Sequence, residues 1–349
     1  MLAFRASRML AFAAVGLVAA ACSDDETTAP STPAVSGSLT VDAASAPAYV
    51  SLGSPTQAVT VADPSASVAW DFSAFGTTIT SNGGGAGPGG VSLYCLCNNA
   101  AATATQLQAM TPATELAAFN AVTSASIPAA DAFAADVLAP SIAGWFDGTA
   151  GATATARASR HWIIRLASTP QRIGKVRITQ ITGATANAAG TVTVEVATQP
   201  AEGGAFGATR SFQVPVGSAP VRVNLSTGAV TTGNDWDLAI GGWTIRVNGG
   251  VSGFGGVATV VSDDTPFAVM SATIAATIPP QVYRADSYTG VFGTKPWYRY
   301  NITGTDNQIW PTYEVYLLKR GTAVWKIQFT GYYDAAGTAR QISFRYEQL

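Results

Sequence analysis

The sequence predicts an all-β protein made of two tandem, homologous domains of mainly antiparallel strands, with one short helical insertion in the first. The composition favours strands and turns over helices, because glycine occurs 35 times and only 11% of the residues are charged. Short segments of the second half alternate apolar and polar residues, which is the pattern of a strand with one buried face. One long segment also occurs twice, which indicates an internal repeat.

The repeated segment reads WDFSAFGTTITSNGGGAGPGGV at residues 70–91 and WDLAIGGWTIRVNGGVSGFGGV at residues 236–257. Upstream, residues 38–52 align without a gap on residues 211–225, and shorter blocks downstream keep the same order in both halves. We therefore predict a tandem duplication with domains at residues 37–200 and 209–349. Each is long enough to bury a core of its own.

The amino terminus resembles a bacterial lipoprotein signal. Arg5 and Arg8 precede an apolar run at residues 9–21, which is too short to span a bilayer, and small residues then lead to Cys22. This predicts a signal peptide at residues 1–21, lipidation of Cys22 and a flexible Pro/Ser/Thr-rich tether at residues 22–36. The predicted location is an outer-membrane lipoprotein, periplasmic or surface-exposed. The alternative is ordinary signal cleavage and a soluble periplasmic or secreted protein.

The first domain begins with short extended runs around Leu39, Tyr49 and residues 68–79, and a glycine-rich loop follows at residues 82–90. The loop contains a G-x-G-x-x-G pattern, but Pro88 interrupts it and no helical pattern follows at once, so we reject a dinucleotide site. Leu107, Met110, Leu116 and Phe119 form a loose helical stripe that predicts a helix within residues 105–122. Strands are predicted again from residue 162 onwards.

The second domain repeats this order with clearer alternation, at Ile245/Val247, Tyr313/Val315/Leu317, Trp325/Ile327/Phe329 and Ile342/Phe344/Tyr346. It also contains nine of the eleven tyrosines and five of the eight tryptophans. If the protein binds a flat aromatic ligand, the second domain has the side chains for it.

Charge and motif content argue against several functions. A net charge of −2 gives no electrostatic attraction to nucleic acid. A nucleophile–base site normally needs a histidine, and His161 is the sole one. We expect it to be a strand-edge residue, with haem or metal ligation as the alternative. We predict no enzymatic activity and no metal site.

Asp71 and Asp237 follow the repeated tryptophans, and we expect them to accept hydrogen bonds from backbone N–H groups at turns or strand ends. Cys95 and Cys97 lie two residues apart on a predicted strand, so a relaxed disulfide is not expected. Two free thiols or a strained pair are the expected states.

Four blocks of the second half are distinctive as a set: residues 236–257, KPWYRY from Lys295, PTYEVYLLKRGTAVWKIQFTGYYD from Pro311 and ISFRYEQL from Ile342. Together they resemble the HmuY family of bacterial haem-binding outer-membrane lipoproteins. The resemblance covers the second half and, through the duplication, the first half more weakly. It implies an all-β fold, haem capture for uptake and transfer to a TonB-dependent transporter.

The sequence departs from the family pattern at the iron ligands. Family members hold haem iron through two axial His or Met side chains, one of them in the loop that corresponds to residues 301–310, which contains neither. A His–His site is excluded within one chain, whereas haem iron also accepts tyrosinate. Haem binding through Tyr or Met, or by hydrophobic contact alone, stays open, and the candidate haem-pocket residues are Tyr298, Tyr300, Trp310 and Met270. The alternative is a non-catalytic envelope interaction or structural module that has lost haem binding.

Overall fold

The computed structural model describes residues 35–349. The predicted signal peptide, Cys22 and nearly all of the predicted tether lie outside the described residues. The described part consists mostly of strands in antiparallel sheets, which confirms the all-β prediction. Among the described residues, no helix has the length and apolar character needed to cross a membrane.

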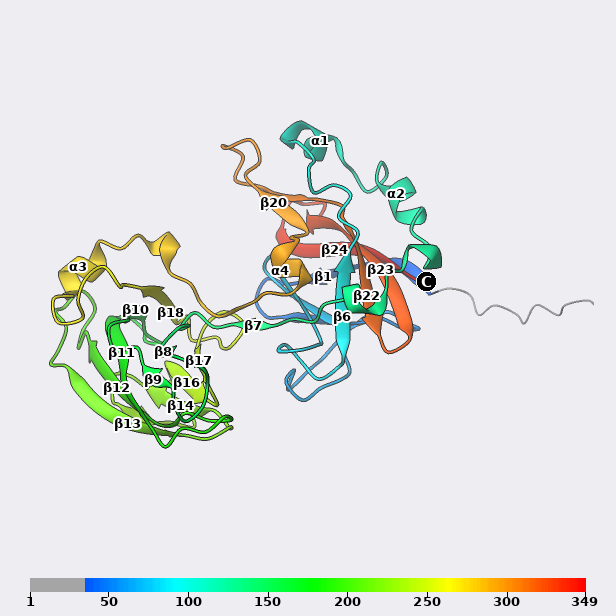
Figure 1. The fold of residues 1–349 in the computed structure, drawn as a ribbon. Helices are drawn as coiled ribbons and strands as arrows, with labels where there is room; N and C mark the ends of the chain where they lie inside the picture. The colour runs from blue at the N-terminus through cyan, green and yellow to red at the C-terminus, as the bar shows by residue number, and fades with distance from the viewer. Residues whose placement is uncertain (1–34) are drawn as a thin grey trace, which may run out of the picture. The chain divides into compact units, whose positions relative to one another are not determined.

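The strands form two units, each built from a five-stranded and a four-stranded sheet that share one core. We call residues 36–137 together with 289–349 the terminal unit, and residues 140–286 the middle unit. Figure 1 shows the distinction by colour, since blue and cyan strands lie with orange and red ones in one unit, and green with yellow in the other.

The terminal unit contains the two ends of the described chain. Its larger sheet has the order β1 (Ser36–Asp42), β24 (Ala339–Gln348), β23 (Ala323–Tyr333), β22 (Val315–Arg320), β6 (Val91–Cys95). Its smaller sheet has the order β3 (Gln57–Val59), β2 (Ala48–Ser51), β4 (Phe72–Phe75), β5 (Thr78–Ser81). The aromatic rings of Phe72, Trp297, Phe329 and Phe344 fill the space between the sheets.

The middle unit repeats this arrangement. Its larger sheet has the order β13 (Arg210–Val216), β12 (Gly190–Thr198), β11 (Ile173–Thr182), β10 (Trp162–Arg165), β18 (Ala258–Val261). Its smaller sheet has the order β15 (Ala229–Val230), β14 (Val221–Asn224), β16 (Leu238–Gly241), β17 (Thr244–Val247). Its core is mainly aliphatic, with Ile164, Val194 and Ile240 fully buried.

Strand partners are exchanged between the two predicted domains. β1 pairs with β24, and β13 pairs with β12, so each larger sheet takes strands from both residues 37–200 and residues 209–349. The expectation that each predicted domain closes its own core is therefore wrong. The physical reason is that matching strands of a repeat can form the same backbone pairing with either copy, as in a domain swap. The duplication itself stays a prediction.

Short strand pairs complete the fold. β7 (Leu138–Ala139) pairs with β19 (Ser287–Tyr288) where the chain passes from one unit to the other. β8 (Phe146–Asp147) pairs with β9 (Thr155–Ala156), and β20 (Tyr298–Tyr300) pairs with β21 (Ile309–Pro311).

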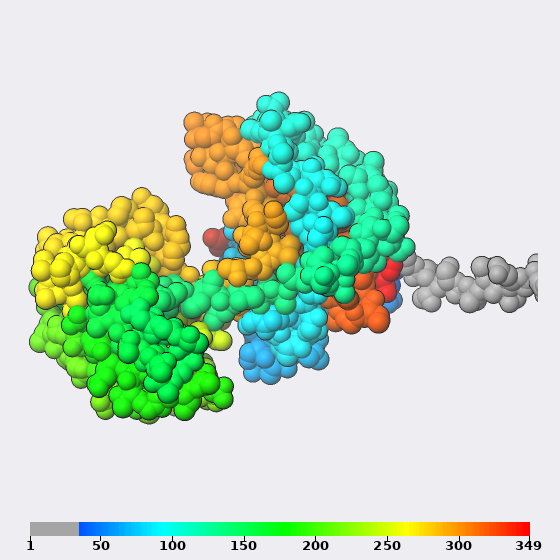
Figure 2. Space-filling view, in the orientation of Figure 1, coloured from blue at the N-terminus to red at the C-terminus, as the bar shows by residue number. Residues whose placement is uncertain are grey.

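The predicted helix at residues 105–122 is two short helices, α1 (Ala104–Ala109) and α2 (Leu116–Asn120). A capping box at Thr103 begins α1, and Pro112 lies between the two because proline interrupts a helix interior. Figure 2 shows this teal segment at the surface of the terminal unit. The helical insertion predicted in the first half is therefore present. Further short helices that the sequence pattern does not predict are α3 (Ala272–Ala276), α4 (Val291–Thr294) and the 3₁₀ turns η1 (Ser124–Ser126), η2 (Ala130–Ala132) and η3 (Pro280–Val282).

Candidate functional site

The β20–β21 hairpin holds three of the four candidate haem-pocket residues. Tyr298 and Tyr300 are two apart on β20, so they lie on one face. Directly opposite residues of an antiparallel pair also share a face, which adds Ile309 and Pro311, the partners of Tyr300 and Tyr298.

The two tyrosines differ in exposure. Tyr298 is half-buried, packs against the terminal core and lies edge-on to Trp297, with ring centroids 5.3 Å apart. Tyr300 is 58% exposed, and its phenol donates a hydrogen bond to Asn307 Oδ1 at 2.9 Å. Tyr300 is therefore the member of the pair whose oxygen a ligand can reach.

Trp310 lies on the opposite face of the hairpin, because its partner across the pair is Arg299. The Trp310 indole N–H donates to Asp306 Oδ2 at 2.9 Å, and Arg299 donates to the carbonyl oxygens of Ala100 and Ala102. Trp310 and the two tyrosines consequently do not line one wall. Which face Trp310 occupies depends on the register between β20 and β21, and the length of the loop between them does not determine that register.

Met270 belongs to the middle unit. It is 2% exposed and packs with Ile163, Ala275 and Tyr283 in a small core cluster, apart from the hairpin residues of the terminal core. The structure therefore does not bring Met270 together with Tyr298 or Tyr300, and its thioether fills a core.

His161 precedes β10 and is fully buried. Its ring lies edge-on to Phe267, with centroids 5.6 Å apart, and neither ring nitrogen has a hydrogen-bond partner among residues 35–349. Burial lowers the pKa of His161 below its usual value, since the charged form loses its hydration. The expected strand-edge position is thus an interior one.

The repeated glycine-rich segments form the same network of hydrogen bonds twice. In the terminal unit, Asn82 donates to Trp70 O at 2.8 Å and accepts from Gly89 N at 3.0 Å. In the middle unit, Asn248 donates to Trp236 O at 2.9 Å and accepts from Gly255 N at 3.0 Å. Both asparagines are buried. The glycine-rich loops therefore close on the protein's own side chains.

Buried aspartates complete each network. Asp71 accepts from Leu52 N at 2.6 Å and Asp237 accepts from Leu225 N at 2.7 Å, which confirms their predicted role as acceptors of backbone N–H groups. Burial raises the pKa of both carboxyl groups, against the opposing effect of these hydrogen bonds. Asp71 also pairs with Arg320 at 2.7 Å. Because the protein's own groups occupy these carboxylates, we assign them a structural role.

Cys95 and Cys97 are joined in a disulfide, with their Cα atoms 5.1 Å apart. Glu314 lies beside the pair, and its carboxylate accepts from Asn99 N at 3.0 and 3.1 Å. Burial raises the pKa of Glu314. As a disulfide, the two sulfur atoms are not thiolate ligands for a metal.

Sequence reasoning missed two buried lysines. Lys175 on β11 is 6% exposed and Lys326 on β23 is 2% exposed, and each lines a cavity. Alternation on β11 assigns Lys175 to the face away from the main core, but residues 267–283 cover that face. One feature of the sequence points to them: the chain has only four lysines, and two of these, Lys175 and Lys326, lie at nearly matching positions of the repeat.

Comparisons with known proteins give limited matches. No family model matches the sequence, and no curated protein matches it. Among solved structures, a candidate lipoprotein from Bacteroides fragilis is 20% identical, covering 37% of this chain and 82% of its own, with a TM-score of 0.15. A candidate HmuY-like haem-binding protein from Bacteroides vulgatus is 15% identical, covering 37% and 84%, with a TM-score of 0.16.

A third solved structure, of the apo form of an HmuY analogue from Tannerella forsythia, is 15% identical and covers 41% of this chain and 84% of its own, with a TM-score of 0.16. Identities and TM-scores at this level say nothing about what this chain binds.

Proposed function

We propose that this chain is a lipid-anchored envelope protein that binds haem or a related flat hydrophobic ligand for uptake, with the terminal unit as the binding unit. The observation that carries the proposal is Tyr300, an exposed phenol on the β20–β21 hairpin, beside an aromatic-rich core. The blocks that resemble the HmuY family at residues 295–300 and 311–334 lie on either side of the loop of this hairpin.

Tyr300 on the hairpin is a better candidate for an iron ligand than His161 or Met270. Haem iron accepts phenolate, and the phenol of Tyr300 is held by one hydrogen bond to the side chain of Asn307. His161 and Met270 are interior residues whose release would expose a core. Ile309, opposite Tyr300, offers an apolar contact for the edge of a flat ring.

The unit is also suited to a flat ligand by composition. Apart from Tyr283 and Tyr288, every tyrosine lies in the terminal unit, because that unit combines the aromatic strands of the second half with Tyr49 and Tyr94. Aromatic side chains contribute large contact areas in binding sites.

We propose no catalysis for this site. The proposed partners are the lipid carried by Cys22, which anchors the chain in the outer membrane, and a TonB-dependent transporter that receives the ligand.

The second candidate function is an envelope interaction or structural module without haem. It is favoured by the burial of His161 and Met270 and by the position of Trp310 on the opposite face from the tyrosines. Both candidates share the same scaffold and differ in whether a ligand reaches Tyr300.

Titration of the purified chain with haemin separates them. The first candidate predicts a Soret shift that saturates at one haem per chain and is abolished in Tyr300→Phe. It also predicts that Tyr49→Phe, on the half-buried strand β2, leaves the shift unchanged. The absence of a saturable shift at any ratio contradicts haem binding and supports the second candidate.

A further inference from the structure

The two buried lysines occupy matching positions in the two units. Lys175 lies opposite Ile163 of β10, and Lys326 lies opposite Leu317 of β22, in sheets of the same strand order. Each ammonium group sits over a phenylalanine ring at 4.6 Å, Phe267 for Lys175 and Phe119 for Lys326. The local environments can therefore be compared atom by atom.

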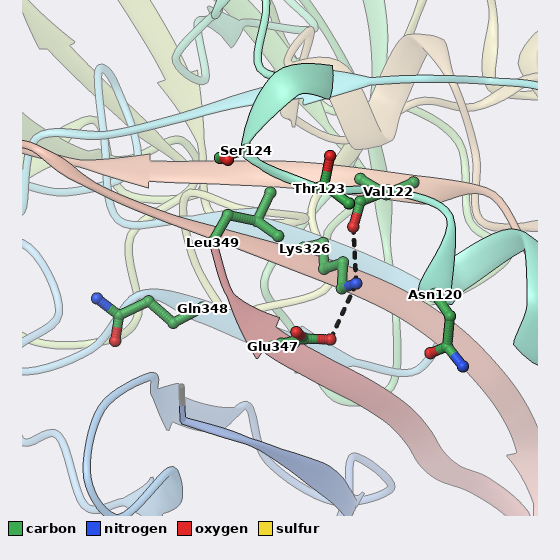
Figure 3. Close-up of a pocket in the computed structure, with 8 residues that line it drawn as sticks. All are labelled: Asn120, Val122, Thr123, Ser124, Lys326, Glu347, Gln348 and Leu349. Atoms are coloured by element: carbon green, nitrogen blue, oxygen red, sulfur yellow. Dashed lines mark hydrogen bonds and ion pairs between the residues drawn. The ribbon is translucent and has the colours of Figure 1, made fainter. Parts of the chain in front are cut away.

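In the terminal unit, the lysine has an anionic partner. Lys326 Nζ donates to Val122 O at 2.8 Å and lies 2.9 Å from Glu347 Oε2 (Figure 3). Glu347 is directly opposite Lys326 on β24. A carboxylate from the neighbouring strand thus compensates the buried charge.

In the middle unit, the matching lysine has no carboxylate. Lys175 Nζ donates to Phe267 O at 2.7 Å and to Met270 O at 2.8 Å, and none of the ion pairs among residues 35–349 includes it. The residue directly opposite Lys175 on β12, where the other unit has Glu347, is Ala197. An ammonium group has three hydrogens, so one remains for a further acceptor.

Neighbouring charges do not supply the missing partner. Arg177 lies over the same Phe267 ring, at 4.5 Å, and is itself paired with Glu195 at 2.7 Å. Burial, with a smaller effect from Arg177, lowers the pKa of Lys175. A buried cation without an anionic partner is unfavourable, and a bound anion would relieve that cost.

Lys175 also lines a cavity of about 260 Å³, together with Phe206, Thr209, Met270 and Ser271. The ring of Phe206 is 5.8 Å from Lys175 Nζ. The cavity thus combines one buried cation with apolar side chains and hydroxyl groups, which is the usual composition of a small-ligand site.

We propose that this cavity binds a small organic carboxylate, whose carboxyl group takes the place at Lys175 that Glu347 takes at Lys326. Phe206 and Met270 contact the apolar part of the ligand. The site is independent of the proposed haem binding, which uses the β20–β21 hairpin.

Hexanoate is the probe, and the methyl group of Met270 is the reporter. In the full chain labelled with ¹³C-methyl methionine, hexanoate shifts the Met270 signal saturably, while the signal of Met110 in α1's C-cap stays in place as an internal control. Hexan-1-ol, which has the same chain without the charge, binds at least about tenfold more weakly, since it lacks the charge-assisted hydrogen bond.

Two variants test the residue assignment. Ala197→Glu places a carboxylate opposite Lys175 and abolishes the hexanoate shift, and Lys175→Met abolishes it by removing the charge. The matched control Thr193→Glu adds the same charge on the same face of β12, beyond Glu195, and leaves the shift unchanged. The proposal is overturned if hexanoate leaves Met270 unshifted, if hexan-1-ol binds equally well, or if the shift persists in both Ala197→Glu and Lys175→Met.

Discussion

Thr40 and Ser343 face each other across β1 and β24, with their hydroxyl oxygens 2.8 Å apart, although 303 positions separate them in the sequence. In the middle unit, Gln213 of β13 faces Thr193 of β12 in the matching place. The first strand of each predicted domain is thus paired with the last strand of the other. Each unit depends on both halves of the chain, so loss of either half removes strands from both cores.

The asparagines of the glycine-rich loops are predicted to stabilise the two units equally. Asn82→Ala leaves the carbonyls of Ser67 and Trp70 and the amide of Gly89 without their partner, and we expect a loss of about 2–4 kcal/mol in the free energy of unfolding. Asn248→Ala should cost the same, because Asn248 makes the matching bonds.

Denaturant unfolding of both variants measures this, with the exposed Asn187→Ala as the control that should change stability by less than about 0.5 kcal/mol. A loss at Asn82 or Asn248 no larger than that of the control would show that the networks do not hold the loops.

A glycine comparison separates backbone strain from steric overlap. Gly84 and Gly76 have nearly the same φ, +60° and +59°, but an added Cβ at Gly84 would overlap Asp136 O whereas nothing lies within 4 Å of one at Gly76. Gly76→Ala should cost about 1 kcal/mol for its left-handed backbone. Gly84→Ala should cost at least about 3 kcal/mol, since the loop must also move away from Asp136. Equal losses in thermal or denaturant unfolding would be inconsistent with the close approach.

His161 should make stability fall on mild acidification. Its pKa in the folded protein is lowered by burial, so the unfolded chain binds the proton first, at about pH 6.5. The contribution of neutral His161 is therefore complete above about pH 6.5 and is lost as the pH falls towards the lowered folded value.

His161→Val, which copies Val315 at the matching position of β22, should remove this part of the pH dependence of unfolding. Because the chain has one histidine, its imidazole proton signal reports the folded pKa without ambiguity. A titration midpoint at or above the ordinary value, or unchanged pH dependence in His161→Val, would refute the assignment.

The alternation of apolar and polar residues predicts where the strands lie, but it does not predict which strands pair with each other. Alternation at Trp325, Ile327 and Phe329 predicts β23, which the structure contains. The exchange of β1 and β13 changes which strands pair but not the strands themselves, so composition and periodicity are the same for both pairings. The strand pairs match Lys175 to Lys326, and the repeated blocks alone do not fix that correspondence to the residue. One residue of slip reverses the face of every side chain.

In the candidate site, too, the sequence pattern predicts what one strand determines but not what depends on strand pairing or packing. That Tyr298 and Tyr300 share a face follows from one strand alone, because they are two residues apart on β20. The position of Trp310 depends on the register between β20 and β21, and the burial of Met270 depends on the segment that covers β11. Those are tertiary relationships, which a single strand pattern does not contain.

Cysteine cross-linking tests the exchange of strands most directly. In the variant Thr40→Cys/Ser343→Cys, oxidation is predicted to form an intramolecular disulfide between positions 40 and 343, identified by peptide mass spectrometry, because these residues are directly opposite on β1 and β24. In Thr40→Cys/Thr193→Cys, no such bond should form. A disulfide between positions 40 and 193, with none between positions 40 and 343, would contradict the exchange and restore two domains that each close their own core.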